Sequence, residues 1–416
     1  MKVAIIGAGF TGLSCAYRLS KKGHKVTIFE KGPTAGGLAA GFKEKNWSWS
    51  LEFFYHHLFP SDLAIQRLIR ELNLDSKLFF KRPKTSVFYH GKISQFDSPF
   101  SLLSFPFLSL LDKLRTGLAT LYLQKTNNWM PLEKVTAFDW LKKAYGQKAF
   151  SILWQPLIAS KFGPYADSVA MSWFWARIKK RNPNLGYIEG GFKILVQALV
   201  EKIKENNGEI ILNHSVESLD NIKGYDRIIV TLPSSAFLKI APSLPADYKK
   251  KLEKLTMLGA IVLIFRLKEK FLTDDTYWLN INEPGFPFVA VVEHTNFIDP
   301  KNYGGERLLY VGGYYPQDHQ FFTKTDKELL NIFLPFLQKI NPNFDFKSKI
   351  SNYKLLKGPF AQPVMPINFS FIKPDYHTPL THVYLANIQQ IYPWDRQTNY
   401  SIEEGEKIAL LVLSES

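Results

Sequence analysis

The chain opens on KVAIIGAGFTG, residues 2–12, and this stretch decides its fold. An apolar run typical of a strand ends directly in the pattern GxGxxG. A second such run, Lys25 to Phe29, ends in Glu30, which stands 18 residues after Gly12. Strand, glycine turn, helix, strand and acid in this order predict a βαβ unit that holds a dinucleotide.

Each glycine of the motif has a separate physical task. Gly7 permits the tight turn, Gly9 lets the backbone approach a pyrophosphate, and Gly12 lets a helix from about Thr11 to Lys22 pack against the strand. The pyrophosphate is expected at the N-terminus of that helix, where free N–H groups favour an anion. Glu30 is expected to accept hydrogen bonds from the adenosine ribose.

The residues after the acid indicate which dinucleotide is bound. Lys31 begins a loop that leads to Gly36, Gly37 and Leu38, so a second glycine pair follows Glu30 at short spacing. A bare glycine backbone can pass close to phosphate or to a flat ring. This combination resembles the amine oxidase superfamily of FAD enzymes, which includes protoporphyrinogen oxidase, phytoene desaturase, monoamine oxidase and, more distantly, UDP-galactopyranose mutase. The resemblance implies a Rossmann-type fold and FAD.

The far end of the chain supports the same resemblance. A strand at 382–387 is followed by a loop from Gln389 to Arg396 and by a final helix that begins near Asn399. In the superfamily this helix brings its positive N-terminus to the pyrimidine edge of the flavin. Many members carry Gly-Asp after the strand, whereas this chain has Ala386-Asn387. The stretch 392–400 resembles a protoporphyrinogen-oxidase-like subgroup of bacterial and archaeal proteins.

A middle segment resembles the part of the superfamily that returns to the nucleotide domain. It comprises a glycine pair before a helix from Phe192 to Glu205, a strand from Glu209 to Asn213, Val216, and a strand from Arg227 to Thr231. We therefore predict an α/β fold, α+β overall, with a discontinuous Rossmann-type FAD domain. The predicted boundaries are 1–75, 185–235 and 375–416 for the FAD domain, and 76–184 and 236–374 for an interleaved substrate domain of mixed sheet and helices.

Together these motifs give a set of expected cofactor-binding residues from four parts of the chain. The set is Gly7, Ala8, Gly9, Phe10, Thr11, Gly12, Glu30, Lys31, Gly36, Gly37, Leu38, Val216, Thr231, Asn387, Thr398 and Asn399. The single Cys15 lies in the first predicted helix, so we expect FAD to be bound non-covalently. One cysteine also builds neither an intramolecular disulfide nor a cysteine metal site, and no metal is expected.

The segment from Phe96 to Leu123 has the most unusual composition in the chain. It is rich in Phe and Leu, is interrupted by Pro99 and Pro106, and its longest uncharged stretch is too short to span a membrane. An ordinary buried helix pair is the simplest interpretation. A cap on an apolar substrate tunnel and a helix lying in a membrane interface are the alternatives.

Composition bounds the remaining possibilities. At 416 residues, with 46% hydrophobic and 15% aromatic residues, the chain suits two interleaved domains and an apolar pocket. The N-terminal apolar run is too short for a signal peptide, so a cytoplasmic protein is expected. The net charge of +15 fits a solvated basic surface, peripheral contact with an anionic membrane, or an anionic substrate. No nucleic-acid-binding module is present, and no nucleic acid is expected.

Two groups of residues are candidates for proton transfer and catalysis. His56 and His57 follow the second glycine pair, at the point where the superfamily chain passes the flavin ring, and a histidine can exchange a proton near neutral pH. A structural role between aromatic neighbours is the alternative. Tyr392 and Arg396, in the C-terminal loop, are expected to line the opposite wall of the substrate channel.

A third group is expected to bind substrate. Trp173 and Arg177 share a face of a predicted helix, and Arg181 is expected to extend it. With Lys161 these cations would hold an anionic head group on a large apolar molecule. The expected substrate residues are Lys161, Trp173, Arg177, Arg181, Tyr187 and Trp394.

The principal hypothesis is an FAD-dependent oxidoreductase that transfers hydride between flavin N5 and a large apolar substrate, an isoprenoid or polyprenyl lipid or a tetrapyrrole. The chain has no second GxGxxG for a nicotinamide cofactor, so an external reductant, oxygen or a quinone would close the cycle. A non-redox mutase acting on a nucleotide sugar, as in UDP-galactopyranose mutase, and an amine oxidase are the alternatives. A catalytically silent FAD-binding protein is a further one.

Overall fold

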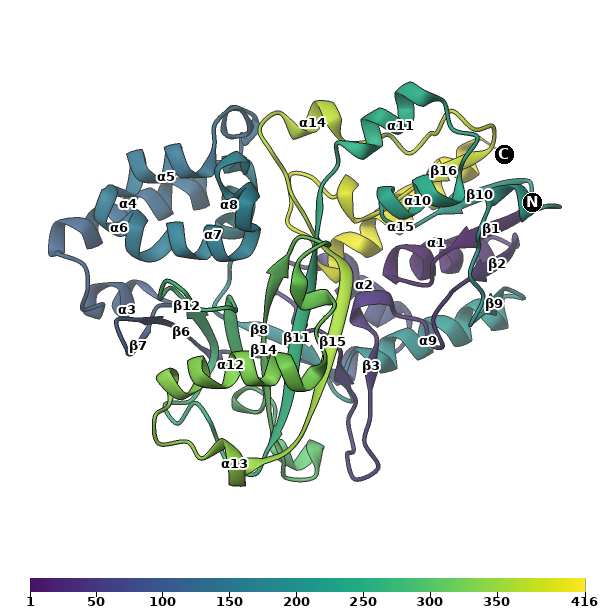
Figure 1. Ribbon diagram of the computed structural model, residues 1–416. Coiled ribbons are helices and arrows are strands. Elements are labelled where there is room, and N and C mark those ends of the chain that lie inside the picture. Colours follow the sequence, from purple (N-terminus) through teal and green to yellow (C-terminus); the bar gives the residue numbers. More distant parts are fainter. Residues whose placement is uncertain (416) are drawn as a thin grey trace.

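A five-stranded parallel sheet carries the N-terminal motif. The computed structural model describes residues 1–415 and is shown in Figure 1. The sheet has the order β16-β10-β1-β2-β9. Its strands are β1 (Lys2–Ile6), β2 (Lys25–Phe29), β9 (Glu209–Ile211), β10 (Arg227–Val230) and β16 (Val383–Leu385). All pair in parallel, so three distant parts of the sequence form one sheet, as the motifs predict.

Three helices belong to this sheet. They are α1 (Phe10–Ser20), α9 (Phe192–Glu205) and α15 (Thr398–Ser414). Helix α1 is buried along almost its whole length, because it packs between the sheet, α9 and α15. The predicted α/β class is confirmed, and both chain termini lie at this end of the molecule (Figure 1).

A second, seven-stranded sheet has the order β15-β11-β14-β13-β12-β6-β7. Its strands are β6 (Lys84–Tyr89), β7 (Lys92–Gln95), β11 (Met257–Leu267), β12 (Thr276–Ile281), β13 (Ala290–Glu293), β14 (Arg307–Tyr315) and β15 (Ile350–Pro363). Only β6 and β12 pair in parallel, so the sheet is mixed. Helix α12 (Asp326–Ile340) covers one face through Leu329, Phe333 and Leu337, and α13 (Phe346–Lys349) follows it.

A helical lobe projects from the seven-stranded sheet, on the side away from the chain termini (Figure 1). It contains α3 (Pro99–Ser104), α4 (Leu110–Lys125), α5 (Ala137–Tyr145), α6 (Gln147–Ala149), α7 (Gln155–Phe162) and α8 (Met171–Lys180). Its core is aromatic, and Trp173, Phe174 and Trp175 are all buried. The short elements elsewhere are β3 (Gly41–Phe42), β4 (Leu51–Glu52), α2 (Leu63–Glu71), β5 (Leu78–Lys81), β8 (Leu185–Ile188), α10 (Ser234–Ile240), α11 (Ala246–Glu253) and α14 (Phe369–Ile372).

The interpretation of residues 96–123 as an ordinary buried helix pair is wrong. In α4 only Thr116 and Leu123 are buried, while most of its leucines face solvent. The cause is that the side of the helix that bears Thr116 and Thr120 faces the rest of the lobe, and Leu123 is the one leucine of α4 on that side. No helix within residues 1–415 combines the length and the apolar character needed to cross a membrane.

The prediction that Arg181 extends the face of the helix bearing Trp173 and Arg177 is also wrong. Helix α8 ends at Lys180, and Arg181 is already extended, with φ −63° and ψ 127°. The sequence Asn182-Pro183 follows directly, and a proline soon after a helix end cannot continue the helix.

Candidate functional site

The turn between β1 and α1 has the geometry that a pyrophosphate needs. Gly7 has φ +106°, and a Cβ on Gly12 would lie 2.0 Å from the carbonyl oxygen of Gly7. Neither position tolerates a side chain. Gly9 differs, because a Cβ there would meet no atom within 4 Å. The space beside Gly9 is therefore open, as a cradle for a phosphate group requires.

Two further features suit a dinucleotide at this turn. The first-turn N–H groups of α1, at Phe10 and Thr11, have no intrahelical acceptor and point out of the helix end. Glu30 accepts hydrogen bonds from the N–H groups of Ala8 (2.9 Å) and Gly32 (2.8 Å). Each carboxylate oxygen can accept a second hydrogen bond, so Glu30 could hold a ribose hydroxyl while it orders the turn.

The second glycine pair lies against the first motif. The N–H of Gly36 donates to the carbonyl of Ala8 at 2.8 Å. Gly36 and Gly37 have φ +118° and +57°, and a Cβ on Gly37 would lie 3.1 Å from the Cα of Gly9. Ala8, Gly9, Gly36 and Gly37 therefore form one continuous glycine-rich wall. Leu38 is half-buried and Lys31 is exposed.

The other expected cofactor residues lie around the same sheet edge. The Thr231 hydroxyl donates to the carbonyl of Ile6 at 2.9 Å and so joins β10 to β1. Asn387 is buried, and its side-chain N–H donates to the carbonyl of Leu232 at 2.9 Å. Val216 is also buried. These contacts order the carboxyl edge of the sheet, where a doubly wound fold binds its ligand.

The C-terminal helix is held tightly to the motif helix. A Cβ on Gly405 would lie 2.4 Å from the carbonyl oxygen of Thr11, so the backbones of α15 and α1 are in direct contact. Thr398 and Asn399 begin α15, and Asn399 Oδ1 accepts from the N–H of Ile65 at 3.1 Å. The N-terminus of α15 is thereby placed beside α2.

A cluster of charged side chains lies where the helical lobe, the seven-stranded sheet and the C-terminal loop meet. We call Lys161, Arg177, Asp395 and Arg396 the Asp395 cluster. Asp395 pairs with Arg177 and accepts from the Trp173 indole N–H at 3.1 Å and from the N–H of Arg396 at 3.1 Å. The sequence predicted four of these residues at the site, namely Lys161, Trp173, Arg177 and Arg396, and the structure brings them together around Asp395.

Lys161 is the least compensated member of this cluster. Its side chain is 6% exposed, and its Nζ lies 5.3 Å from the ring centre of Trp173 and 5.0 Å from that of Tyr314. Burial, reinforced by the charge of Arg177, lowers the pKa of Lys161 well below its usual value. Burial would raise the pKa of Asp395, but Lys161, Arg177 and Arg396 outweigh it and hold that pKa well below its usual range. The cluster thus carries an excess of positive charge.

Tyr55, Tyr314 and Gln362 complete the cluster, and sequence reasoning missed all three. Arg396 Nε donates to Gln362 Oε1 at 2.8 Å, and the Arg396 guanidinium also contacts the Tyr314 hydroxyl. The Tyr314 and Tyr55 hydroxyls lie 3.4 Å apart. Tyr314 is the penultimate residue of β14 and Gln362 lies in β15, so only strand pairing brings them to the C-terminal loop. Tyr55, directly before the histidine pair, was the one a local signal could have found.

The Asp395 cluster is continuous with the glycine-rich wall. Gly358 of β15 sits between them, because a Cβ there would lie 2.8 Å from the Phe54 ring and 3.5 Å from the Leu38 side chain. Phe54 precedes Tyr55, whose hydroxyl meets Tyr314. One path of contacts therefore runs from the dinucleotide motif to the charged cluster.

Both histidines are neutral at physiological pH. Burial lowers the pKa of His56 to about 4 and that of His57 to about 3. The Nδ1 of His56 lies 2.6 Å from the carbonyl oxygen of Phe54, which requires Nδ1 to be the donor. The Nε2 atom of His56 is then an acceptor. His57 Nδ1 is buried with no hydrogen-bond partner.

The remaining expected residues have mainly structural contacts. Tyr392 donates to Glu133 at 2.6 Å and lies 2.8 Å from the Ser172 hydroxyl, which fastens the C-terminal loop to the helical lobe. Trp394 stacks between Trp175 and Tyr400, at ring distances of 5.3 and 5.8 Å.

Tyr187 and Arg181 lie outside the contacts of the Asp395 cluster. Tyr187 is fully buried, and its hydroxyl donates to Glu52 at 2.6 Å. Glu52 also accepts from the N–H of Phe192 at 2.7 Å, so this pair caps α9. Arg181 is exposed. A substrate role for either residue stays a prediction.

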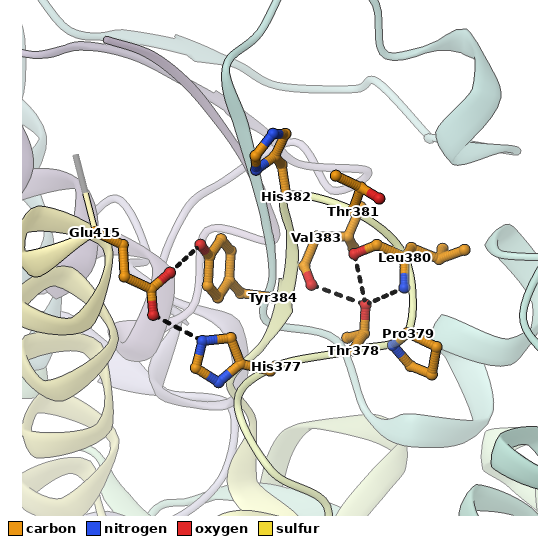
Figure 2. Close-up of a pocket in the computed structure, with 9 residues that line it drawn as sticks. All are labelled: His377, Thr378, Pro379, Leu380, Thr381, His382, Val383, Tyr384 and Glu415. Atoms are coloured by element: carbon orange, nitrogen blue, oxygen red, sulfur yellow. Dashed lines mark hydrogen bonds and ion pairs between the residues drawn. The ribbon is translucent and has the colours of Figure 1, made fainter.

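A separate pocket of about 370 Å³ is lined by the loop that precedes β16, by the start of β16 and by Glu415 (Figure 2). There Glu415 bonds His377 at 2.7 Å and the Tyr384 hydroxyl at 2.6 Å. Its loop, 377–382, enters the amino end of β16. Since ligands of doubly wound sheets bind at the carboxyl ends of the strands, this pocket is at the wrong edge for the dinucleotide.

The glycine cradle, the acid after β2 and the returning C-terminal helix define a flavin-binding enzyme. The model of the flavin containing amine oxidoreductase family matches residues 10–387, and the chain belongs to this family. It is an FAD-dependent oxidoreductase, which confirms the class and the cofactor expected from the sequence.

Several individual proteins are similar to this chain, at sequence identities of 14% to 22%. The 15-cis-phytoene desaturase of Synechococcus elongatus is 22% identical, over 93% of this chain and 90% of that protein. A protein from Exiguobacterium sp. 255-15, provisionally named a protoporphyrinogen oxidase, has a structure with a TM-score of 0.78 at 14% identity, covering 100% of this chain and 99% of that one. The structure of reduced UDP-galactopyranose mutase also has a TM-score of 0.78. It is 16% identical in sequence, and the match covers 100% of this chain and 96% of that one.

Proposed function

We propose that this enzyme desaturates or saturates a large apolar substrate that carries an anionic head group. The observation that carries the proposal is the Asp395 cluster, in which three cations surround one carboxylate beside aromatic rings. FAD, when bound, would accept or donate a hydride at N5, that is, one proton together with two electrons. An isoprenoid or polyprenyl lipid fits best, and the similarity to a phytoene desaturase supports an apolar chain. A tetrapyrrole has the same apolar character.

The cluster would bind the head group of this substrate. Lys161 lies between the rings of Trp173 and Tyr314 and lacks a carboxylate of its own, because Asp395 already pairs with Arg177. An incoming phosphate or carboxylate would restore the charge balance and raise the pKa of Lys161 again. A substrate this apolar partitions into lipid, so we expect the protein to meet it at a membrane surface.

We propose His56 as the proton acceptor. Its Nδ1 proton is committed to the Phe54 carbonyl, so Nε2 presents a lone pair at neutral pH. Desaturation would break one C–H bond as hydride and a neighbouring C–H bond as a proton. Nε2 would receive the proton, and the electron pair of that second bond would become the new double bond.

A mutase that acts on a nucleotide sugar is the second candidate. The excess positive charge of the Asp395 cluster would suit a diphosphate equally well, and the fold is shared with UDP-galactopyranose mutase. The same charge disfavours an amine oxidase, because a protonated amine would be repelled by Lys161, Arg177 and Arg396.

The test is to identify the small molecules that copurify with the protein without detergent, by mass spectrometry. FAD with an isoprenoid or tetrapyrrole supports the proposal, whereas FAD with a nucleotide sugar moves the mutase to first place.

The head-group contact is tested with Lys161→Met, which removes the charge but keeps the apolar stem. We expect KM for an anionic substrate to rise roughly tenfold or more, in line with the loss of a charge-assisted hydrogen bond. KM for an uncharged analogue should be unchanged. The matched control is Lys180→Met, since Lys180 is half-buried on Trp394 outside the cluster. Equal effects on both substrates would contradict a head-group role.

A further inference from the structure

Exposed apolar side chains are concentrated in the helical lobe. Of the sixteen large apolar residues that are exposed within residues 1–415, ten lie between Phe100 and Val135. Phe100 is 80% and Leu111 is 79% exposed. Single exposed leucines are ordinary, but a concentration of this kind marks an interaction surface.

Helix α4 is amphipathic, but its apolar side faces solvent and its polar side faces the protein. At about 100° per residue, its exposed apolar side chains fall within an arc of about 120° on one side. These residues, here named the α4 face, are Leu110, Leu111, Leu114, Leu118, Leu121 and Tyr122. Thr116 and Leu123, the two buried residues, lie on the opposite side.

Polar contacts fix this orientation. Arg115 donates to the carbonyls of Ala144 (2.9 Å) and Lys143 (2.6 Å) of α5, and the Thr120 hydroxyl lies 3.0 Å from that of Tyr145. Ser109 caps the helix through a reciprocal pair with Asp112. Because the polar side of α4 is bonded to the lobe, the apolar side cannot turn inward without breaking these bonds.

The part of the chain that carries the α4 face has an excess of basic residues. Between residues 99 and 150 the sequence has seven Lys and Arg against three Asp and Glu, and Glu133, one of the three, is buried. Lys125 ends the helix within the apolar arc, and Arg115 lies at its rim. Apolar side chains on one face with basic residues beside them are the signature of a helix that lies in an anionic lipid interface.

We propose that the α4 face, together with Phe100 and Leu103 of α3, docks on the surface of an anionic lipid bilayer. The leucines enter the boundary between head groups and acyl chains, and Lys125 and the neighbouring Lys142, Lys143 and Lys148 contact lipid phosphates. A second copy of the chain would carry the same positive charge on the same face, which disfavours self-association there. The docking does not depend on the proposed reaction.

The first test places a polarity-sensitive fluorophore on Leu118→Cys in the full-length protein. The native Cys15 is fully buried, so the label reports the introduced position. We expect a blue shift with vesicles that contain phosphatidylglycerol and a much smaller one with pure phosphatidylcholine. Leu410→Cys, 67% exposed on α15, is the control and should not respond. No shift with any vesicle, or equal shifts at both positions, would overturn the proposal.

The second test uses two single variants, Leu114→Glu and Leu118→Glu, and measures how much of each protein floats with the same anionic vesicles. Each substitution removes an apolar side chain from the lipid and places a negative charge beside the anionic head groups. The amount of protein that floats with the vesicles should therefore fall roughly tenfold or more. The unfolding temperature should stay that of the wild type, with Leu410→Glu as the matched control. Unchanged flotation would overturn the proposal. So would a protein-concentration-dependent dimer without vesicles that Leu118→Glu abolishes, because it would assign the face to a second copy.

Discussion

Asp395 is the carboxylate of a cluster that also contains three cationic side chains, and its charge should be visible in the pH dependence of stability. The folded-state pKa lies below the usual value near 4. The contribution of Asp395 is therefore fully present above that value and is lost as the pH falls toward the folded-state pKa. Asp395→Asn should lower the free energy of unfolding at pH 7 by about 3 kcal/mol, because the cations lose their partner.

Urea unfolding at pH 7 and at pH 3 checks this prediction. The gap between wild type and Asp395→Asn should be smaller at pH 3, because the Asp395 carboxyl of the unfolded wild type then binds a proton that the folded protein does not, which favours unfolding. Asp167→Asn, at an exposed position, should change little at either pH. A gap that does not depend on pH would show that Asp395 acts by packing and not by charge.

The glycines of the first motif separate folding from cofactor binding. Gly12→Ala puts a Cβ 2.0 Å from a backbone oxygen, so we expect loss of folded protein. Gly9→Ala meets no protein atom within 4 Å, so the protein without FAD should keep its unfolding temperature while its FAD affinity falls. The flavin-to-protein absorbance ratio and calorimetry measure the two effects. Normal FAD content in Gly9→Ala would contradict the placement of the pyrophosphate.

At the scale of elements, the contact between α1 and α15 positions the cradle. Gly405→Val would force the two backbones apart, because even a Cβ would lie 2.4 Å from the Thr11 carbonyl oxygen. Overpacking of this kind costs about 1–3 kcal/mol or more. We expect a lower unfolding temperature together with lower FAD content. Leu410→Ala, exposed on the same helix, should affect neither.

Local sequence patterns predicted the elements of the nucleotide sheet, because glycine turns and apolar runs act over a few residues. In the second domain, four apolar runs at 261–267, 277–281, 288–293 and 308–314 also predict strands, and they correspond to β11 to β14. β6, β7 and β15 were not: in β15 the burial pattern of Ile350–Pro363 is irregular and offers no alternation to read. The orientation of α4 was missed for a related reason, since the periodicity of its leucines does not say whether they face the core or solvent.

The charged site was predicted in part. Lys161, Trp173, Arg177 and Arg396 were expected from their residue types, but Tyr314 and Gln362 come from β14 and β15, far away in sequence. Tyr187 was expected at the site because it lies just before a glycine pair, but it is buried in the core, where it donates to Glu52. Such pairings depend on strand register, which no local pattern contains. The proposed domain boundaries likewise stay a prediction.

For the whole molecule, FAD should act as a bridge between distant chain segments. Its expected contacts come from the N-terminal motif, the middle segment and the C-terminal helix, so removal should lower the stability of all three together. A ligand at 100 times its Kd stabilises a protein by about 2.7 kcal/mol. Calorimetry of the protein with and without FAD should show an unfolding temperature that rises with FAD concentration. Equal temperatures would contradict the bridging role.

The central claim, redox chemistry on a large apolar substrate, is tested most directly by mixing the FAD-loaded enzyme anaerobically with an isoprenoid substrate in vesicles. We predict bleaching of the visible flavin absorption and a product with one additional carbon–carbon double bond; for a saturating enzyme, the reduced form regains its absorption as a double bond is lost. Absorption unchanged with every isoprenoid and tetrapyrrole offered, together with a covalent flavin–sugar adduct on addition of a nucleotide sugar, would contradict the claim.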